Sequence, residues 1–182
     1  MSHRYGMALS IRGTLVLLYL ALVMPLPALA PAGLRATLLA ALPIGLLLVL
    51  AISSERVELS EAGLELRHPG WCRWWLRRGW QLGWDQIRGL TPVATSQGGR
   101  VYYVRTTAGA SVLLPQRLEQ FDDFLARFGR HTGLDTSAIG RISLAWTYQL
   151  LLALSALMVA AELGAGWALL TGRWVFPPGS VL

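Results

Sequence analysis

The stretch GTLVLLYLALVMPLPALAPAGL, residues Gly13–Leu34, contains no charged side chain. Two further uncharged stretches, Ala36–Ser54 and Ile142–Ala161, are similar to it in length and composition. As a helix, each is long enough to cross the roughly 30 Å hydrocarbon core of a bilayer at about 1.5 Å per residue. The sequence therefore predicts an integral membrane protein with three spans and a long polar segment between the second and the third.

The first stretch also has features of a secretory signal peptide. Arg4 and Arg12 precede it, and Ala28–Ala30 has the form of a cleavage site. Pro31 would directly follow the cut, where we expect proline to block cleavage, and the second apolar stretch starts soon afterwards. These two observations favour a helical hairpin that is retained in the protein.

Arginine placement predicts the orientation in the membrane, because cytoplasmic flanks carry an excess of positive charge. The connection between the first two stretches has Arg35, and the tail after the third has Arg173. The other flanks are richer in arginine, with Arg4, Arg12, Arg56, Arg127, Arg130 and Arg141. We therefore expect a cytosolic N-terminus, a cytosolic polar segment and a C-terminus on the other side. The third span is expected to end near Ala161, which places Glu162 at the outer interface.

Within the polar segment the pattern changes to the alternation typical of β-strands. Val57–Leu66 alternates apolar and polar residues around a turn at Glu61–Gly63, which predicts a β-hairpin. In Val101–Arg105, successive residues should face opposite sides of a strand. The remaining strands of an antiparallel meander are expected at Gly79–Leu82, Ile87–Thr95, Arg100–Thr106 and Ser111–Leu114.

An amphipathic helix is predicted at Leu118–Thr132, with Gly133 as its C-cap. The apolar residues recur at helical spacing and should pack on the sheet: Leu118, Phe121, Phe124, Leu125 and Phe128. The fold class expected is an α+β membrane protein. Its parts are a transmembrane hairpin over 1–54, a soluble domain over 55–135, a C-terminal transmembrane helix over 142–170 and a short tail over 171–182.

This order of elements resembles the bacterial pleckstrin-homology-like (PH-like) domains of small membrane proteins. The resemblance rests on the hairpin Val57–Leu66, the Trp-x-x-Ile-x-x-Leu pattern of Trp84–Leu90, and the strand pair Tyr102–Leu114 leading into the helix Leu118–Thr132. It covers Glu55–Gly133 and implies a twisted antiparallel half-barrel capped by the helix, without enzymatic activity. A span after the domain departs from the family, which usually has helical hairpins only before it.

A second similarity is to the photosystem I assembly membrane proteins of cyanobacteria and chloroplasts. They share an N-terminal hairpin followed by a soluble module, and Pro69-Gly70 followed by Arg77-Arg78 matches a segment found there. By analogy of role, this similarity implies an assembly or stability factor for a larger, photosynthetic membrane complex. The membrane expected is the plasma membrane, or the thylakoid in a cyanobacterium.

The most unusual local composition lies between Trp71 and Trp84, where five of the eight tryptophans gather. Tryptophan favours the headgroup layer and arginine pairs with lipid phosphate, so the segment predicts a membrane-contacting surface. Two interpretations stay open beside it: Trp74, Trp80 and Trp84 pack in the core, or the surface binds a protein. The residues assigned to this surface are Trp71, Arg73, Trp74, Trp75, Arg77, Arg78 and Trp80.

No catalytic constellation is found. Cys72 is the only cysteine, and His3, His68 and His131 fit no metal-ligand spacing. No nucleophile triad and no glycine-rich phosphate loop occurs. We therefore expect no cofactor, metal or nucleic acid, and a non-enzymatic binding or scaffold module that contacts anionic headgroups or a protein partner. The alternative is the assembly or stability factor.

Overall fold

The computed structural model describes residues 2–72, 74–76, 79–96, 99–140 and 145–173. Two compact units are formed. The helical unit comprises Gly13–Val49 and Gln149–Leu182, and the α+β unit comprises Met1–Arg12 and Leu50–Tyr148. The N-terminal segment therefore groups with the domain that follows the second apolar stretch, which the sequence did not predict.

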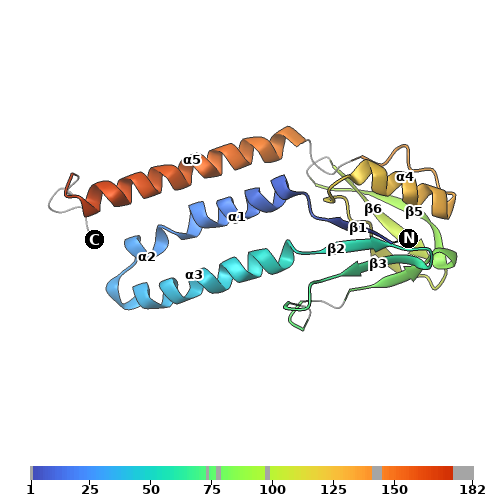
Figure 1. The fold of residues 1–182 in the computed structure, drawn as a ribbon, viewed down its shortest axis with the longest axis horizontal. Coiled ribbons are helices and arrows are strands. Elements are labelled where there is room, and N and C mark those ends of the chain that lie inside the picture. The colour runs from blue at the N-terminus through green and yellow to red at the C-terminus, as the bar shows by residue number, and fades with distance from the viewer. Residues whose placement is uncertain (1, 73, 77–78, 97–98, 141–144, 174–182) are drawn as a thin grey trace. The chain divides into compact units, whose positions relative to one another are not determined.

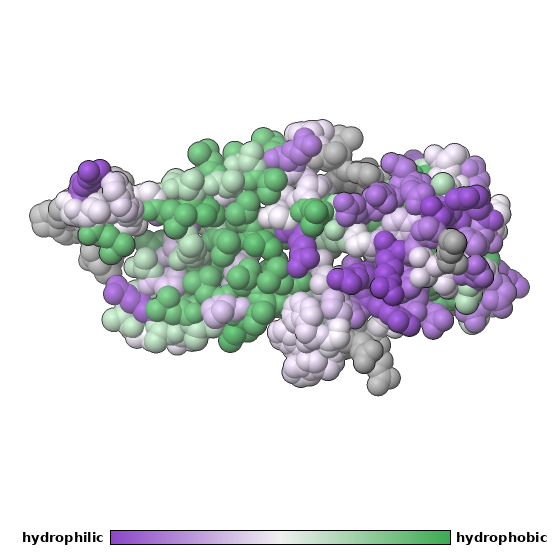
Figure 2. Space-filling model, viewed as in Figure 1, coloured by the Kyte–Doolittle hydropathy of each residue, from purple (hydrophilic) through white to green (hydrophobic). Residues whose placement is uncertain are grey.

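Three of the described helices are long and apolar enough to cross a membrane, as predicted: Leu9–Leu29, Ala32–Ile52 and Trp146–Leu170. The first consists of α1 (Leu9–Val23) and the short α2 (Leu26–Leu29), the second is α3 (Ala32–Ile52), and the third lies in α5 (Ala145–Leu170). At most 11% of any of the three apolar windows is buried. Figure 2 shows hydrophobic residues gathered over these helices. Such a surface is energetically unfavourable in water.

The third apolar helix ends at Leu170, which is the predicted end of the C-terminal helix. The sequence also places the end of the membrane span near Ala161 and Glu162 at the outer interface, and α5 continues past both residues. Glu162 therefore lies within the helix, and its Oε2 atom is buried with no hydrogen-bond partner among the described residues.

One contact ties the two arms of the hairpin together. The hydroxyl of Tyr19 on α1 donates a hydrogen bond to the backbone carbonyl of Leu42 on α3, at 2.7 Å. Gly45 makes this approach possible, because a Cβ at that position would overlap the Tyr19 hydroxyl. The predicted retained hairpin therefore has a specific packing contact between its arms.

The α+β unit contains two antiparallel sheets (Figure 1). The first has the strand order β1-β2-β3-β4 and the second β5-β6-β7. The strands of the first sheet are β1 (His3–Gly6), β2 (Arg56–Leu59), β3 (Gly63–Arg67) and β4 (Gln81–Gly83). After a short 3-10 turn, η1 (Trp84–Gln86), the second sheet contains β5 (Ile87–Ala94), β6 (Arg100–Thr106) and β7 (Ser111–Leu113). Helix α4 (Phe121–Thr132) follows.

Strand β1 corrects the predicted boundary of the N-terminal hairpin. Tyr5 pairs with Val57 in the register between β1 and β2. On its other side, the amide of Ala8 donates to the carbonyl of Arg117, and the amide of Glu119 donates to the carbonyl of Gly6. Residues 1–54 are therefore not all hairpin. The hairpin is inserted between two neighbouring strands of one sheet.

The core lies between the sheets and α4. Val57, Leu64 and Val104 contribute from the sheets, and Phe121, Phe124 and Phe128 contribute from the helix. The predicted apolar stripe is therefore core. The helix itself starts later than expected, because Gln120 adopts a left-handed conformation and Leu118 instead forms a bridge with Met7.

The α+β unit also extends past its predicted end at residue 135. The hydroxyl of Tyr102 donates to the carbonyl of Ala138 at 2.8 Å, and Ile139 is buried in the core. Gln116 donates to the carbonyl of Gly140 at 2.8 Å. The segment after α4 is thus held against the second sheet by side-chain hydrogen bonds that leave no periodic signal in the sequence.

A polar cluster fastens β1 to α4. The Tyr5 hydroxyl donates to Asp123 Oδ2 at 2.5 Å, and Arg127 Nε donates to the same oxygen at 2.8 Å. The Arg127 guanidinium and the Tyr5 hydroxyl hold the pKa of Asp123 below its ordinary value. Burial and the Asp123 carboxylate raise the pKa of Tyr5 to about 12.

The raised pKa of Tyr5 predicts a loss of stability in alkali. Unfolded tyrosine titrates near 10, so between pH 10 and 12 the unfolded chain releases a proton that folded Tyr5 retains. The stabilisation is complete below pH 10 and falls as the pH rises towards 12. Denaturant unfolding of the wild type and of Tyr5→Phe should give stability curves that converge only in this window. Parallel curves would contradict the assignment.

Candidate functional site

The tryptophan-rich segment connects β3 to β4 and forms a tight turn. The amides of Trp75 and Leu76 both donate to the carbonyl of Cys72, at 3.1 and 2.9 Å. Trp71, Trp74 and Trp75 are 50%, 85% and 51% exposed. We call these three residues together with Cys72 the tryptophan turn. It presents large apolar rings outside the core.

Cys72 anchors this turn to the end of α3. Its side chain is 1% exposed, and its Sγ atom lies 3.5 Å from the hydroxyl of Ser54 and 3.5 Å from the carbonyl of Pro69. Ser54 in turn donates to the carbonyl of Ala51 within α3, at 2.6 Å. Because α3 ends at Ile52, the tryptophan turn is held where an apolar helix of spanning length ends.

The core-packing interpretation is right for two of its three residues and wrong for the third. Trp80 and Trp84 are partly buried against the core, whereas Trp74 is the most exposed of the tryptophans in this segment. Trp84 donates from Nε1 to the carbonyl of Ser60 at 2.9 Å and stacks on His131 with 4.6 Å between ring centroids. Trp80 therefore does not belong to the exposed surface to which the sequence assigned it.

The predicted arginines of this surface, Arg73, Arg77 and Arg78, lie outside the described residues. The described part of the surface is thus the set of exposed indole rings.

An apolar cavity that the sequence did not indicate adjoins the start of β2. Its volume is about 490 Å³, and its walls come from α3, β3, the segment before β4 and β7. Ile52 and Leu113 line it and remain about half exposed. His68 lines it too, with a side chain only 6% exposed and Nε2 3.7 Å from Glu55 Oε1. Exposed apolar side chains thus lie near the end of α3 as well as in the tryptophan turn.

Among the described residues, no three His, Cys, Asp or Glu side chains lie close enough together to hold a metal ion.

The chain is 37% identical over 174 residues to the uncharacterized protein slr0269 of Synechocystis sp. (strain ATCC 27184 / PCC 6803 / Kazusa). The alignment covers 92% of this chain and 85% of that protein. The chain belongs to the slr0269 family. Because the alignment covers nearly the whole chain, the similarity includes both the helical unit and the α+β unit. No family model matches the chain, and no solved structure matches it.

Proposed function

We propose that this member of the slr0269 family is an integral membrane protein whose α+β unit is a non-enzymatic, PH-like binding module. The tryptophan turn is the part of the module that rests in the headgroup layer. The observation that carries the proposal is the position of Trp74, which is 85% exposed in a turn that Cys72 and Ser54 fasten to the end of α3.

Insertion into the membrane is supported by the exposed apolar helices. A helix of about 20 apolar residues matches the hydrocarbon core, and all three candidate spans have at least 21 residues. Little of their apolar surface is covered within the chain. Lipid is the environment in which such helices are stable.

The pairing of β1 with β2 supports a topology in which the N-terminus and the module lie on the same side of the membrane. The chain leaves the sheet after β1, passes through the hairpin and returns to the same sheet as β2. Because the start of the first span and the end of the second span both connect to this sheet, both lie on the same side of a bilayer. The arginine distribution at those ends favours the cytosolic side.

The PH-like interpretation is supported by the order of elements. The described residues form an antiparallel sheet of four strands, then one of three strands, and then α4, which supplies three buried phenylalanines to the core between them. A half-barrel capped by a single helix has this order. Binding surfaces on such a scaffold lie on loops, and the tryptophan turn is a loop of this kind.

A fluorescent label at position 74 tests the membrane contact. Full-length Trp74→Cys protein is labelled at position 74 with an environment-sensitive dye and reconstituted into liposomes. We expect the attached dye to emit at a shorter wavelength than the same dye in aqueous buffer. Brominated lipids should quench most of its emission, because an interfacial residue lies within reach of the upper acyl chains. Fluorescence with and without brominated lipid provides the measurement.

The matched control is Val93→Cys on β5, which replaces another exposed apolar residue of the same unit. It should show little quenching. The native thiol of Cys72 is 1% exposed, so the unsubstituted chain should take up little dye. Equal quenching at positions 74 and 93 would contradict a specific contact. A label at 74 that is quenched only after a co-purifying protein is removed would favour the assembly-factor alternative, with the tryptophan turn as its partner surface.

A further inference from the structure

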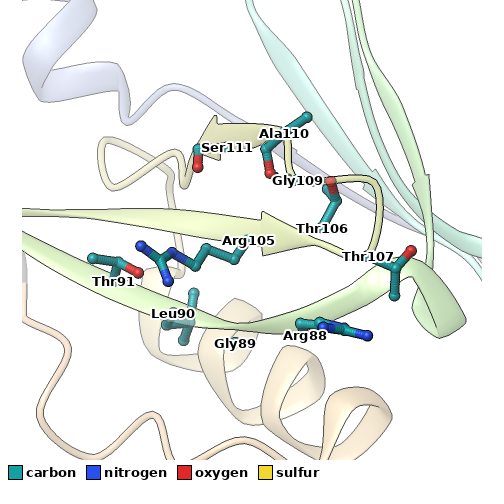
Figure 3. A pocket seen from close by; sticks show the side chains of 10 residues that line it. All are labelled: Arg88, Gly89, Leu90, Thr91, Arg105, Thr106, Thr107, Gly109, Ala110 and Ser111. Atoms are coloured by element: carbon teal, nitrogen blue, oxygen red, sulfur yellow. Dashed lines mark hydrogen bonds between the residues drawn. The ribbon is translucent and has the colours of Figure 1, made fainter.

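We propose that a hollow on the second sheet binds an anion with two phosphoryl groups through Arg88 and Arg105. The hollow has a volume of about 560 Å³ and lies where β5, β6 and the β6–β7 turn meet (Figure 3). It is far larger than one phosphate needs, and its walls are mainly small, hydroxyl-bearing or basic residues. This proposal does not depend on the tryptophan turn.

Strand register builds the hollow. Arg105 on β6 is paired with Gly89 on β5 and with Ser111 on β7, so the three residues form one row across the sheet. Tyr102 and Val104 alternate with Arg105 and are buried, which places Arg105 on the outer face. Gly89 has no side chain, so it leaves space beside the aliphatic part of the Arg105 side chain. The row therefore forms the base of the hollow, with the Arg105 side chain at its centre.

A register shift between Ile87 and Gly89 adds the second cation. Arg88 lies within this irregularity and lines the same hollow. In Figure 3 the guanidinium of Arg105 extends towards Thr91, whereas that of Arg88 extends along β5 in the opposite direction. Two separated cationic groups fit an anion with two charged ends better than a single phosphate.

The charged residues that line the hollow are all basic. No carboxylate lines it. Arg4, Arg67 and Arg127 each pair with an acid: Glu58, Glu65 and Asp123, respectively. Across the described residues, neither Arg88 nor Arg105 has a salt bridge or a side-chain hydrogen bond. Two unneutralised cations in one hollow repel each other, and a bound anion removes this cost.

Hydroxyl groups complete the set of donors. Thr106 is already used, because its hydroxyl donates to the carbonyl of Ala110 at 3.0 Å. The hydroxyls of Thr91, Thr107 and Ser111 also line the hollow and are bonded to no described residue. Guanidinium and hydroxyl donors with no carboxylate beside them are the chemistry that recognises phosphate oxygens. Pyrophosphate compounds and the two-phosphate headgroup of cardiolipin share this chemistry.

Arginine modification tests the site in the unaltered full-length protein. The protein in phosphatidylcholine nanodiscs is treated with phenylglyoxal, and the rate at each arginine is read by peptide mass spectrometry. We expect pyrophosphate, at about ten times its Kd, to slow modification of Arg88 and Arg105 by about tenfold, because only the unoccupied fraction of the protein reacts. Arg100 is the matched control, since it is an exposed arginine on β6 outside the hollow.

A second arm replaces pyrophosphate with cardiolipin in the nanodisc and distinguishes the two sources. Protection by pyrophosphate alone assigns a soluble ligand, and protection by cardiolipin alone assigns a lipid headgroup. Arg105→Gln should weaken binding of the protecting anion by about tenfold, whereas Arg100→Gln should leave it unchanged. The proposal is overturned if neither anion protects the two arginines, or if Arg100 is protected to the same extent.

Discussion

Deletion of β1, residues His3–Gly6, is expected to unfold most of the α+β unit in the full-length protein. The strand buries Tyr5 to 4% exposure, pairs with β2 on one side, and accepts a hydrogen bond from the amide of Glu119 at Gly6 on the other. Loss of a buried aromatic side chain alone costs roughly 3–5 kcal/mol, and a domain is stable by only about 5–15 kcal/mol. Circular dichroism during thermal unfolding in detergent should show that the cooperative transition is lost or strongly lowered.

The control for this deletion keeps the strand and removes only its surface charge. Arg4 lies 3.4 Å from Glu58 with 70% of its side chain exposed. Exposed pairs of this kind contribute about 0–1 kcal/mol, so Arg4→Gln should melt close to the wild type. If the deletion melted like Arg4→Gln, β1 would not be part of the fold of this unit.

Phe124→Ala is the second change with a large expected effect. Phe124 is 0% exposed, meets Tyr5 edge-on at 5.6 Å between ring centroids, and lies between Phe121 and Phe128 on α4. Replacing a buried phenylalanine with alanine leaves a cavity and costs about 3–5 kcal/mol. The free energy of unfolding, measured with urea on the full-length protein in detergent micelles, should fall by that amount.

Leu113→Ala provides the comparison, because Leu113 is apolar but 47% exposed. Its truncation removes little buried surface and should cost clearly less than Phe124→Ala. A Phe124→Ala variant that lost no more stability than Leu113→Ala would show that α4 does not close the core.

The β-hairpin Val57–Leu66 and the later strands of the meander were predictable because their sequence signals are local. Val57–Leu66 alternates in the sequence and pairs across Glu61–Gly63 as expected, with Val57 opposite Leu66. The inward positions of Tyr102 and Val104 also follow the predicted alternation. Strand β1 was not predictable in this way, because four residues with the sequence His-Arg-Tyr-Gly carry no alternation and pair with a strand some fifty residues away.

The two proposed sites differ in how much the sequence revealed. The concentration of tryptophan was visible, but the separation of exposed Trp74 from half-buried Trp80 depends on the Cys72–Ser54 contact. Arg88 and Arg105 are seventeen positions apart (105 − 88) and share no motif. They line one hollow because the β5–β6 pairing places Gly89 opposite Arg105.

By itself, the sequence determined three apolar helices of spanning length and a helix with a phenylalanine face, because hydropathy and helical spacing depend on neighbouring residues only. The tertiary structure alone decided that the N-terminus supplies a strand, that the tryptophan turn is held at the end of α3, and that two unpaired arginines share a hollow. Each of these depends on pairing between residues far apart in the chain, and such pairing is stabilised only once the whole core has formed.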